Sequence, residues 1–147
     1  MRDMLNNKQV VHLGNVTVSG TTPAASSWVD TRGFDACTLV MVSNTVTDAG
    51  TAAGFTATLQ EGDDSTAAGA TDVAAADAVD GTLTIAEITD GDDNTVSGAV
   101  GYKGSSRYAR LNVVGTTGSD ADVSVIAILN KPHRAATTLV GTAVAAT

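Results

Sequence analysis

The chain has 147 residues and a mass of 14.7 kDa, which is the size of a single domain. Sixteen acidic residues against eight basic ones give a formal net charge of −8, which argues against general nucleic-acid binding because that needs a basic surface. No apolar run reaches about 18 residues and the first residues lack an apolar stretch, so we expect neither a membrane-spanning helix nor a secretory signal.

The first half of the chain predicts strands separated by turns. Short apolar runs at residues 10–18 and 27–30 are followed by the run 36–42, which we expect to form a central strand covered on both faces. Residues 45–54 are mostly small and predict a loop. Residues 55–61 alternate apolar and polar side chains, which is typical of a strand with one buried face.

The second half continues this pattern. Residues 82–85 predict a strand, and 96–102 with 107–114 predict a hairpin around a turn. The last strand covers residues 122–129 and ends before Pro132. With about eight strands, the chain is expected to be all-β, either an antiparallel β-sandwich or a jelly-roll-like barrel.

The two ends of the chain differ from the middle. We expect an N-terminal arm at residues 1–9, the β domain at 10–132 and a C-terminal arm at 133–147, because neither end has a clear strand or helix period. Apolar residues in such a tail are explained if it becomes ordered on a neighbouring subunit or partner; the alternative is a frayed tail. Inside the domain, the alanine-rich residues 66–79 predict a loop with a helical turn.

Charge is distributed unevenly along the sequence. The stretch from Gly33 to Tyr102 holds twelve acidic residues and no basic one, while the rest holds eight basic and four acidic residues. If this division is kept in space, the molecule has an acidic outer end and a mildly basic docking face that orients it on an acidic partner. Otherwise the acidic residues only solvate long loops.

Acidic turns are the candidates for metal binding. Glu61, Asp63, Asp64 and residues 90–94 supply the oxygen ligands that calcium prefers. Their spacing differs from that of an EF-hand loop, so we interpret them as solvated turns and expect no bound metal or other cofactor.

Catalytic motifs are absent from the sequence. His12 and His133 lie near opposite ends and outside any known catalytic pattern, and the apolar run around Cys37 predicts a buried, inert thiol. The glycine-rich residues 101–107 lack the spacing of a phosphate-binding loop and are better explained by a turn. We therefore expect a non-enzymatic protein.

Four motifs occur in an order that resembles a known group. They are Thr31-Arg32-Gly33-Phe34-Asp35, the run from Phe55 to Asp64, the run from Val100 to Arg110, and Ala127-Ile128-Leu129-Asn130-Lys131-Pro132. Together they resemble small virion proteins of tailed bacteriophages and prophages that are encoded among the head genes. The resemblance covers about residues 5–134. The chain departs from it at Ala109, where members carry a longer side chain, and in a longer insert at 66–80.

This resemblance implies a role as a capsid decoration or cement protein. Members fold as a β-sandwich or jelly roll on the capsid exterior, bind the major capsid protein and act as small oligomers, with a trimer favoured. No catalytic residue, nucleic acid or membrane is implied. Our candidates for docking combine cations and apolar anchors near the two ends of the chain: Arg2, Leu5, Lys8, Lys131, Arg134, Leu139 and Val140.

Two alternatives remain open at this point. One is another virion part, such as a tail, neck or fibre-attachment module, which would differ in its location on the particle. The other is a carbohydrate-binding or adhesion module. That module needs an exposed aromatic platform, which only Trp28, Tyr102 or Tyr108 could supply.

Overall fold

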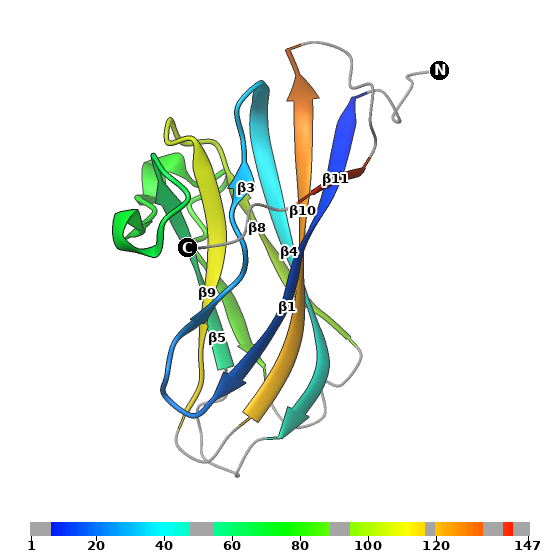
Figure 1. Cartoon of the computed structure of the whole chain (residues 1–147), viewed down its shortest axis with the longest axis vertical. Coiled ribbons are helices and arrows are strands. Elements are labelled where there is room, and N and C mark those ends of the chain that lie inside the picture. Colours follow the sequence, from blue (N-terminus) through cyan, green and yellow to red (C-terminus); the bar gives the residue numbers. More distant parts are fainter. Residues whose placement is uncertain (1–6, 48–54, 89–94, 117–119, 134–139, 143–147) are drawn as a thin grey trace.

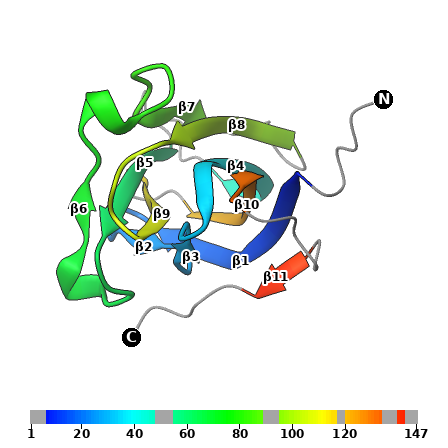
Figure 2. The same cartoon turned by 90° about the horizontal axis from the view of Figure 1, so that it is seen from above.

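The computed structural model describes residues 7–47, 55–88, 95–116, 120–133 and 140–142. The predicted all-β class is confirmed, because these residues form two facing sheets (Figures 1 and 2). Sheet A has the order β11 (Val140–Thr142), β1 (Lys8–Ser19), β10 (Asp120–Pro132), β4 (Phe34–Thr47) and β8 (Thr95–Tyr102). Sheet B has the order β2 (Ala24–Ala25), β9 (Tyr108–Val114), β5 (Phe55–Gly62) and β6 (Thr71–Asp72), with β3 (Val29–Asp30) paired to β9 and β7 (Thr84–Ile88) paired to β5.

The strand order identifies the topology. Strands β2 and β3 pair in turn with β9 and act as one interrupted strand. The four strands β1, β10, β4 and β8 then face β2/β3, β9, β5 and β7, which is the order of an eight-stranded jelly roll. All pairings within this set are antiparallel, whereas β11 adds to the edge of β1 in parallel.

Alternating side chains build the core between the sheets. In β10, Val123, Val125, Ala127 and Leu129 are buried while the residues between them face outward, as their spacing predicts. Phe55 is the one phenylalanine in this core, so small and branched aliphatic side chains fill most of it. The low aromatic content of the sequence is therefore matched by close packing of two aliphatic faces.

The predicted hairpin of residues 96–102 and 107–114 is wrong. Strand β8 pairs with β4 in sheet A, and β9 pairs with β5 in sheet B, so residues 103–107 cross from one sheet to the other. Alternation shows which face of a strand is buried but not which strand is its neighbour, and both arrangements bury the same residues.

The structure also tests the predicted loop at residues 45–54, the central strand and the loop at residues 66–79. Strand β4 continues to Thr47, so the loop begins later than residue 45, and its outward residues Thr38, Val40 and Val42 are only half-buried rather than covered. The loop with helical turns is confirmed by the short 3-10 helices η1 (Ala67–Gly69) and η2 (Ala75–Asp77).

The predicted arms overlap the fold at both ends. Strand β1 begins at Lys8, inside the predicted N-terminal arm, and β11 lies inside the predicted C-terminal arm. Val10, Val11 and His12 of β1 pair with β11, so part of that arm lies on the sheet of its own chain. No helix in the described part of the chain is long and apolar enough to cross a membrane.

Candidate functional site

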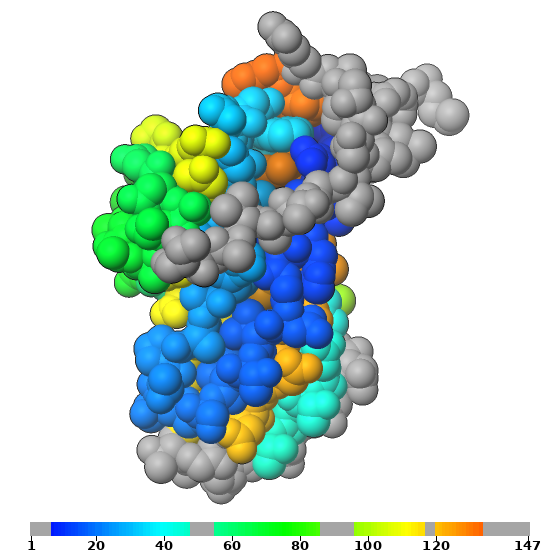
Figure 3. Space-filling model, in the orientation of Figure 1, coloured from blue at the N-terminus to red at the C-terminus, as the bar shows by residue number. Residues whose placement is uncertain are grey.

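Five of the six described lysines and arginines gather at one end of the sandwich; the sixth, Arg110, is buried within β9 (Tyr108–Val114). The register pairs Lys8 with Asn130, and Pro132 with Phe34, so β1, β10 and β4 share this end. In Figure 3 the end of β10 (orange), the turn before β4 (light blue) and the loop after β8 (yellow) lie together at the top. We call this region the basic end; its members are Lys8, Arg32, Lys103, Arg107 and Lys131.

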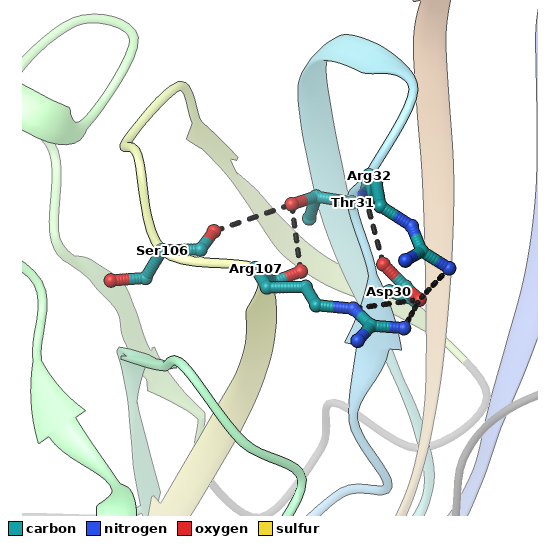
Figure 4. A network of polar contacts seen from close by, with 5 residues as sticks. All are labelled: Asp30, Thr31, Arg32, Ser106 and Arg107. Carbon is teal, nitrogen blue, oxygen red and sulfur yellow. Dashed lines mark hydrogen bonds and ion pairs between the residues drawn. The ribbon is translucent and has the colours of Figure 1, made fainter.

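A network of polar contacts holds two loops of the basic end together (Figure 4). Both Nε and Nη2 of Arg107 donate to Oδ2 of Asp30, at 3.1 and 2.6 Å, and the backbone N–H of Arg32 donates to Oδ1 at 3.0 Å. The Thr31 hydroxyl donates to the backbone carbonyls of Arg107 and Ser106. The turn before β4 and the loop between β8 and β9 therefore form one frame.

Ionisation follows from this geometry. Partial burial opposes the charge of Asp30, but the hydrogen bonds from Arg107 and Arg32 and their positive charges outweigh it and lower the pKa of the carboxyl. The hydrogen bond to Asp30 raises the pKa of Arg107 in turn. Both groups are charged at neutral pH, and the side chain of Arg32 remains 72% exposed.

The hydroxyl of Tyr102 makes a second set of contacts at the basic end. The Tyr102 hydroxyl donates to Oε2 of Glu61 at 2.6 Å and to the backbone carbonyl of Ser106 at 3.1 Å. Burial, together with the carboxylate of Glu61, raises the pKa of Tyr102 above its usual range. The phenol therefore remains protonated and acts as a structural link between β8, β5 and the loop.

An open hollow of about 270 Å³ lies between the two loops. Residues 31–34 line one side and residues 104–107 the other. Arg32 and Arg107 provide positive charge at its rim, the hydroxyls of Ser105 and Ser106 provide polar groups, and Phe34 provides an apolar surface. A carboxylate-bearing segment suits this combination, since guanidinium groups bind carboxylates with charge-assisted hydrogen bonds.

The structure places part of the predicted docking set at this end. Lys8 begins β1 and its Nζ donates to Oδ1 of Asn130 at 2.6 Å, while Lys131 is exposed near the end of β10. Val140 lies in β11, and its side chain is outside the described residues, as are Arg2, Leu5, Arg134 and Leu139. The anchors predicted from the chain ends thus remain predictions.

Lys131 has an unusual backbone. Its φ of 52° lies in the left-handed region, which a non-glycine residue in a strand rarely adopts. The N–H of Lys131 donates to the carbonyl of Asn7, and the next N–H, that of His133, donates to Gly33. These bonds hold the strained residue in place and direct the chain past the turn before β4.

Acidic side chains do not separate as cleanly as the sequence suggested. Asp35 lies at the start of β4, and Asp63 and Asp64 follow the end of β5, so all three are near the basic end although they belong to the acidic stretch. Asp35 lies 2.9 Å from His133 there. Asp120 and Asp122 begin β10 at the opposite end. The basic end is therefore a cluster of cations among acids rather than a uniformly positive face.

Other candidate chemistry finds little support in the geometry. The Cys37 thiol is buried, which raises its pKa to about 12 and leaves it unreactive at neutral pH. Asp64 accepts hydrogen bonds from the hydroxyl and N–H of Thr66, as in a simple turn. Among the described residues, no three His, Cys, Asp or Glu side chains are placed to hold a metal ion; residues 90–94 lie outside them.

The aromatic side chains are not arranged as a sugar-binding platform. Trp28, Tyr102 and Tyr108 are 0%, 1% and 8% exposed, so none presents a free ring face to solvent. A carbohydrate-binding module that depends on stacking against these rings would need them at the surface. This removes the residues on which that alternative rested.

Sequence reasoning missed Arg32 and Arg107 as members of the site. Both stand beside turn residues in the sequence, which was the available signal. Whether two loops share an end depends on the direction of each strand and on the sheet it joins, and 75 residues separate Arg32 from Arg107. The wrongly predicted hairpin concealed this relation.

Comparison with known proteins adds no assignment: no protein-family model matches the chain, and no curated protein matches it.

Proposed function

We propose that this chain is a non-enzymatic virion protein that binds the outer surface of a bacteriophage capsid and stabilises contacts between subunits of the major capsid protein. The observation that carries the proposal is that five of the six described lysines and arginines, all but the buried Arg110, gather at one end of an acidic molecule. The resemblance of its motifs to phage head proteins supplies the kind of partner. Self-association is part of this role, and the resemblance favours a trimer.

The basic end suits an acidic partner surface in two ways. Its exposed cations, Arg32, Lys103 and Lys131, steer association, and the frame of Asp30 and Arg107 keeps the two loops in place before contact. A rigid site loses less conformational entropy when it binds. On a capsid lattice many weak contacts act together, because each bound copy holds its neighbours at high effective concentration.

Charge changes at the basic end test the docking. We expect Arg32→Glu and Lys103→Glu each to weaken binding to undecorated heads about 10-fold at low salt, since like charges then face the acidic partner. Lys131→Asn removes one charge while keeping a residue that tolerates the left-handed backbone, and we expect a smaller loss.

The matched control is Thr56→Glu, which adds an acid to an exposed position opposite Val114, away from the basic end. Co-sedimentation with heads at several salt concentrations measures occupancy. Unchanged occupancy for all three variants at the basic end would contradict docking through that end. Binding to tails but not to heads would place the protein in another part of the virion.

Two truncations test the predicted C-terminal arm. Removing residues 133–147 deletes the apolar anchors Leu139 and Val140 together with β11, and we expect lower capsid occupancy. Removing only residues 143–147 retains β11 and is the control for the loss of that strand. If the longer deletion leaves occupancy and particle stability unchanged, the arm has no part in docking.

A further inference from the structure

The outer face of sheet A carries a band of aliphatic side chains among uncharged polar ones. Among the described residues, the large hydrophobic side chains that are exposed are Val10, Val79 and Val96, at 40%, 53% and 68%. Val10 alternates with the buried residues of β1, and Val96 pairs with the outward Val42 of β4 beyond a β-bulge in β8, so both point outward. Val79 packs over Gly101, where an added Cβ would collide with its methyl group. All three exposed side chains therefore belong to one face.

Half-buried aliphatic residues join them across the sheet. The register aligns Val10 with Ile128, Ile126 with Val40, and Val42 with Val96. Three adjacent rows of this face thus carry branched side chains over four strands: Val10, Ile128, Thr38 and Gly101; His12, Ile126, Val40 and Ala99; and Asn15, Ser124, Val42 and Val96. We call these rows the apolar face.

Charge lies only at the two ends of the apolar face. In the described part of the chain, its three rows hold no Asp, Glu, Lys or Arg. The row before them holds Lys8, beside Asn130, and the row after them holds Asp122, beside Thr17. The face is therefore uncharged at its centre, positive at one end and negative at the other.

We propose that the apolar face binds a second copy of this chain about a two-fold axis through the row of His12, Ile126 and Val40. Rotation about that axis exchanges the rows at the two ends, so Lys8 of each copy meets Asp122 of the other. A two-fold interface uses the same patch twice and must be complementary to itself. This arrangement of charges meets that requirement, and it lets molecules of net charge −8 approach through a neutral surface.

The size of the face suits a concentration-dependent dimer. Four strands spaced ~4.8 Å apart and eight residues of rise at ~3.4 Å, from the row of Lys8 to the row of Asp122, give a footprint of roughly 500 Å² for the apolar face together with its two charged ends. Stable interfaces bury about 800 Å² per partner, and the accessible area of a corrugated face exceeds its projection. Packing of sheet on sheet at about 10 Å is the common way to cover such a surface.

The proposal specifies the self-association included in the proposed function and differs from the trimer that the resemblance favours. It concerns the chain free in solution, so its test needs no capsid. Failure of docking at the basic end would leave the dimer intact, whereas failure of the dimer would leave capsid binding by single chains intact. The two outcomes are therefore distinguishable.

The first test is the mass in solution of the full chain and of one variant. Light scattering or sedimentation at pH 8 and from about 1 μM to 1 mM should show a rise toward twice the chain mass of 14.7 kDa. Ile126→Lys places two like charges beside the axis, and we expect it to weaken dimerisation about 100-fold or more. Thr56→Lys, on the outer face of sheet B, adds the same charge and should leave the dimer unchanged.

The second test uses charge reversal and does not depend on how Ile126→Lys folds. Lys8→Glu and Asp122→Lys should each weaken the dimer about 10-fold, and the double variant should restore it. Within one chain these residues lie ~27 Å apart along β10, so the rescue requires contact between chains.

Each remaining outcome overturns the proposal. A monomer throughout the concentration range shows that the face does not associate. A trimer excludes the two-fold arrangement, and a dimer that is insensitive to Ile126→Lys places the interface elsewhere. A double charge reversal that is weaker than either single variant excludes the pairing of Lys8 with Asp122.

Discussion

The outer faces of the two sheets differ in how far their large side chains are covered. On sheet B, Trp28, Tyr108 and Arg110 are at most 8% exposed and pack on one another outside the core. On sheet A, the outward residues are aliphatic, and Val10 and Val96 remain exposed. A jelly roll can therefore cover one outer face with its own large side chains and leave the other for a partner.

Two aromatic rings and two guanidinium groups cover the outer face of sheet B, with one guanidinium over each ring. The Arg107 guanidinium lies 4.8 Å from the ring centroid of Tyr108, and that of Arg110 lies 4.3 Å from the centroid of Trp28. The two rings meet edge to face at 6.5 Å. Arg107 in turn binds Asp30, so the covered face of sheet B continues into the basic end. Packing on this face therefore supports the proposed docking loops.

We expect the largest loss of stability from removing the side chain of Trp28, which covers the outer face of sheet B. Trp28→Ala leaves a large void under Arg110 and Tyr108, and we expect a loss of about 3–5 kcal/mol in the free energy of unfolding. Urea denaturation measures it. Trp28→Phe is the matched control: it loses ring area but also removes a buried Nε1 for which the described residues supply no hydrogen-bond partner, so its cost should be less than half. A loss under about 1 kcal/mol for the alanine variant would contradict the buried stack.

Arg110 tests whether the cation contributes to this packing. Burial lowers the pKa of its guanidinium, which stays charged at neutral pH, and its Nε donates to Oε1 of Gln60 at 3.1 Å. We expect Arg110→Ala to cost about 2 kcal/mol, from the lost contact with Trp28 and the lost hydrogen bond. A double-mutant cycle with Gln60→Ala separates the two contributions. No change in stability would show that the buried charge gains nothing from the ring.

Asp30 lies at the edge of the covered face of sheet B, and its contribution to stability depends on pH. Its pKa is lowered by folding, so its stabilisation is complete above the unfolded value of about 3.9 and is lost as the pH falls through the folded value. Asp30→Asn should therefore cost up to about 1 kcal/mol at pH 7, because the pair is partly exposed, and less at pH 2. Urea denaturation at both pH values measures this difference. Equal costs at both pH values would assign the effect to packing instead of charge.

Local patterns in the sequence were sufficient to predict most of the longer strands and the buried faces of those that alternate, but not the short strands β2, β6 and β11. Residues 55–61 and 122–129 alternate as expected, and Pro132 ends β10. The partners of β8 and β9 could not be predicted, because alternation is the same in a hairpin and in a crossing between sheets. The stack at Trp28 was missed for a related reason: its neighbour Arg110 is 82 residues away in the sequence.

The site was predictable only in part. Lys8 and Lys131 were chosen because they are cations near the chain ends, and the structure places both at the basic end. The interaction of Arg107 with Asp30 depends on β3 and the start of β9 lying side by side, where Asp30 pairs with Tyr108. A tertiary relation of this kind is invisible to composition and spacing. The mostly apolar outward side of 122–129 was visible in the sequence, but its extension over four strands required the register.

The smallest change in stability is expected for a substitution on sheet A, and its size should depend on protein concentration. Ile126 is half-buried on the outer face, so Ile126→Thr keeps a β-branched side chain and should change the unfolding free energy of the dilute chain by less than about 1 kcal/mol. At high concentration the loss should grow, because association stabilises the folded chain by mass action and the variant associates less. Thermal unfolding at about 1 μM and 1 mM measures both regimes. If the loss is the same at both concentrations, Ile126 stabilises the chain itself, and the outer face of sheet A is then covered from within, as that of sheet B is.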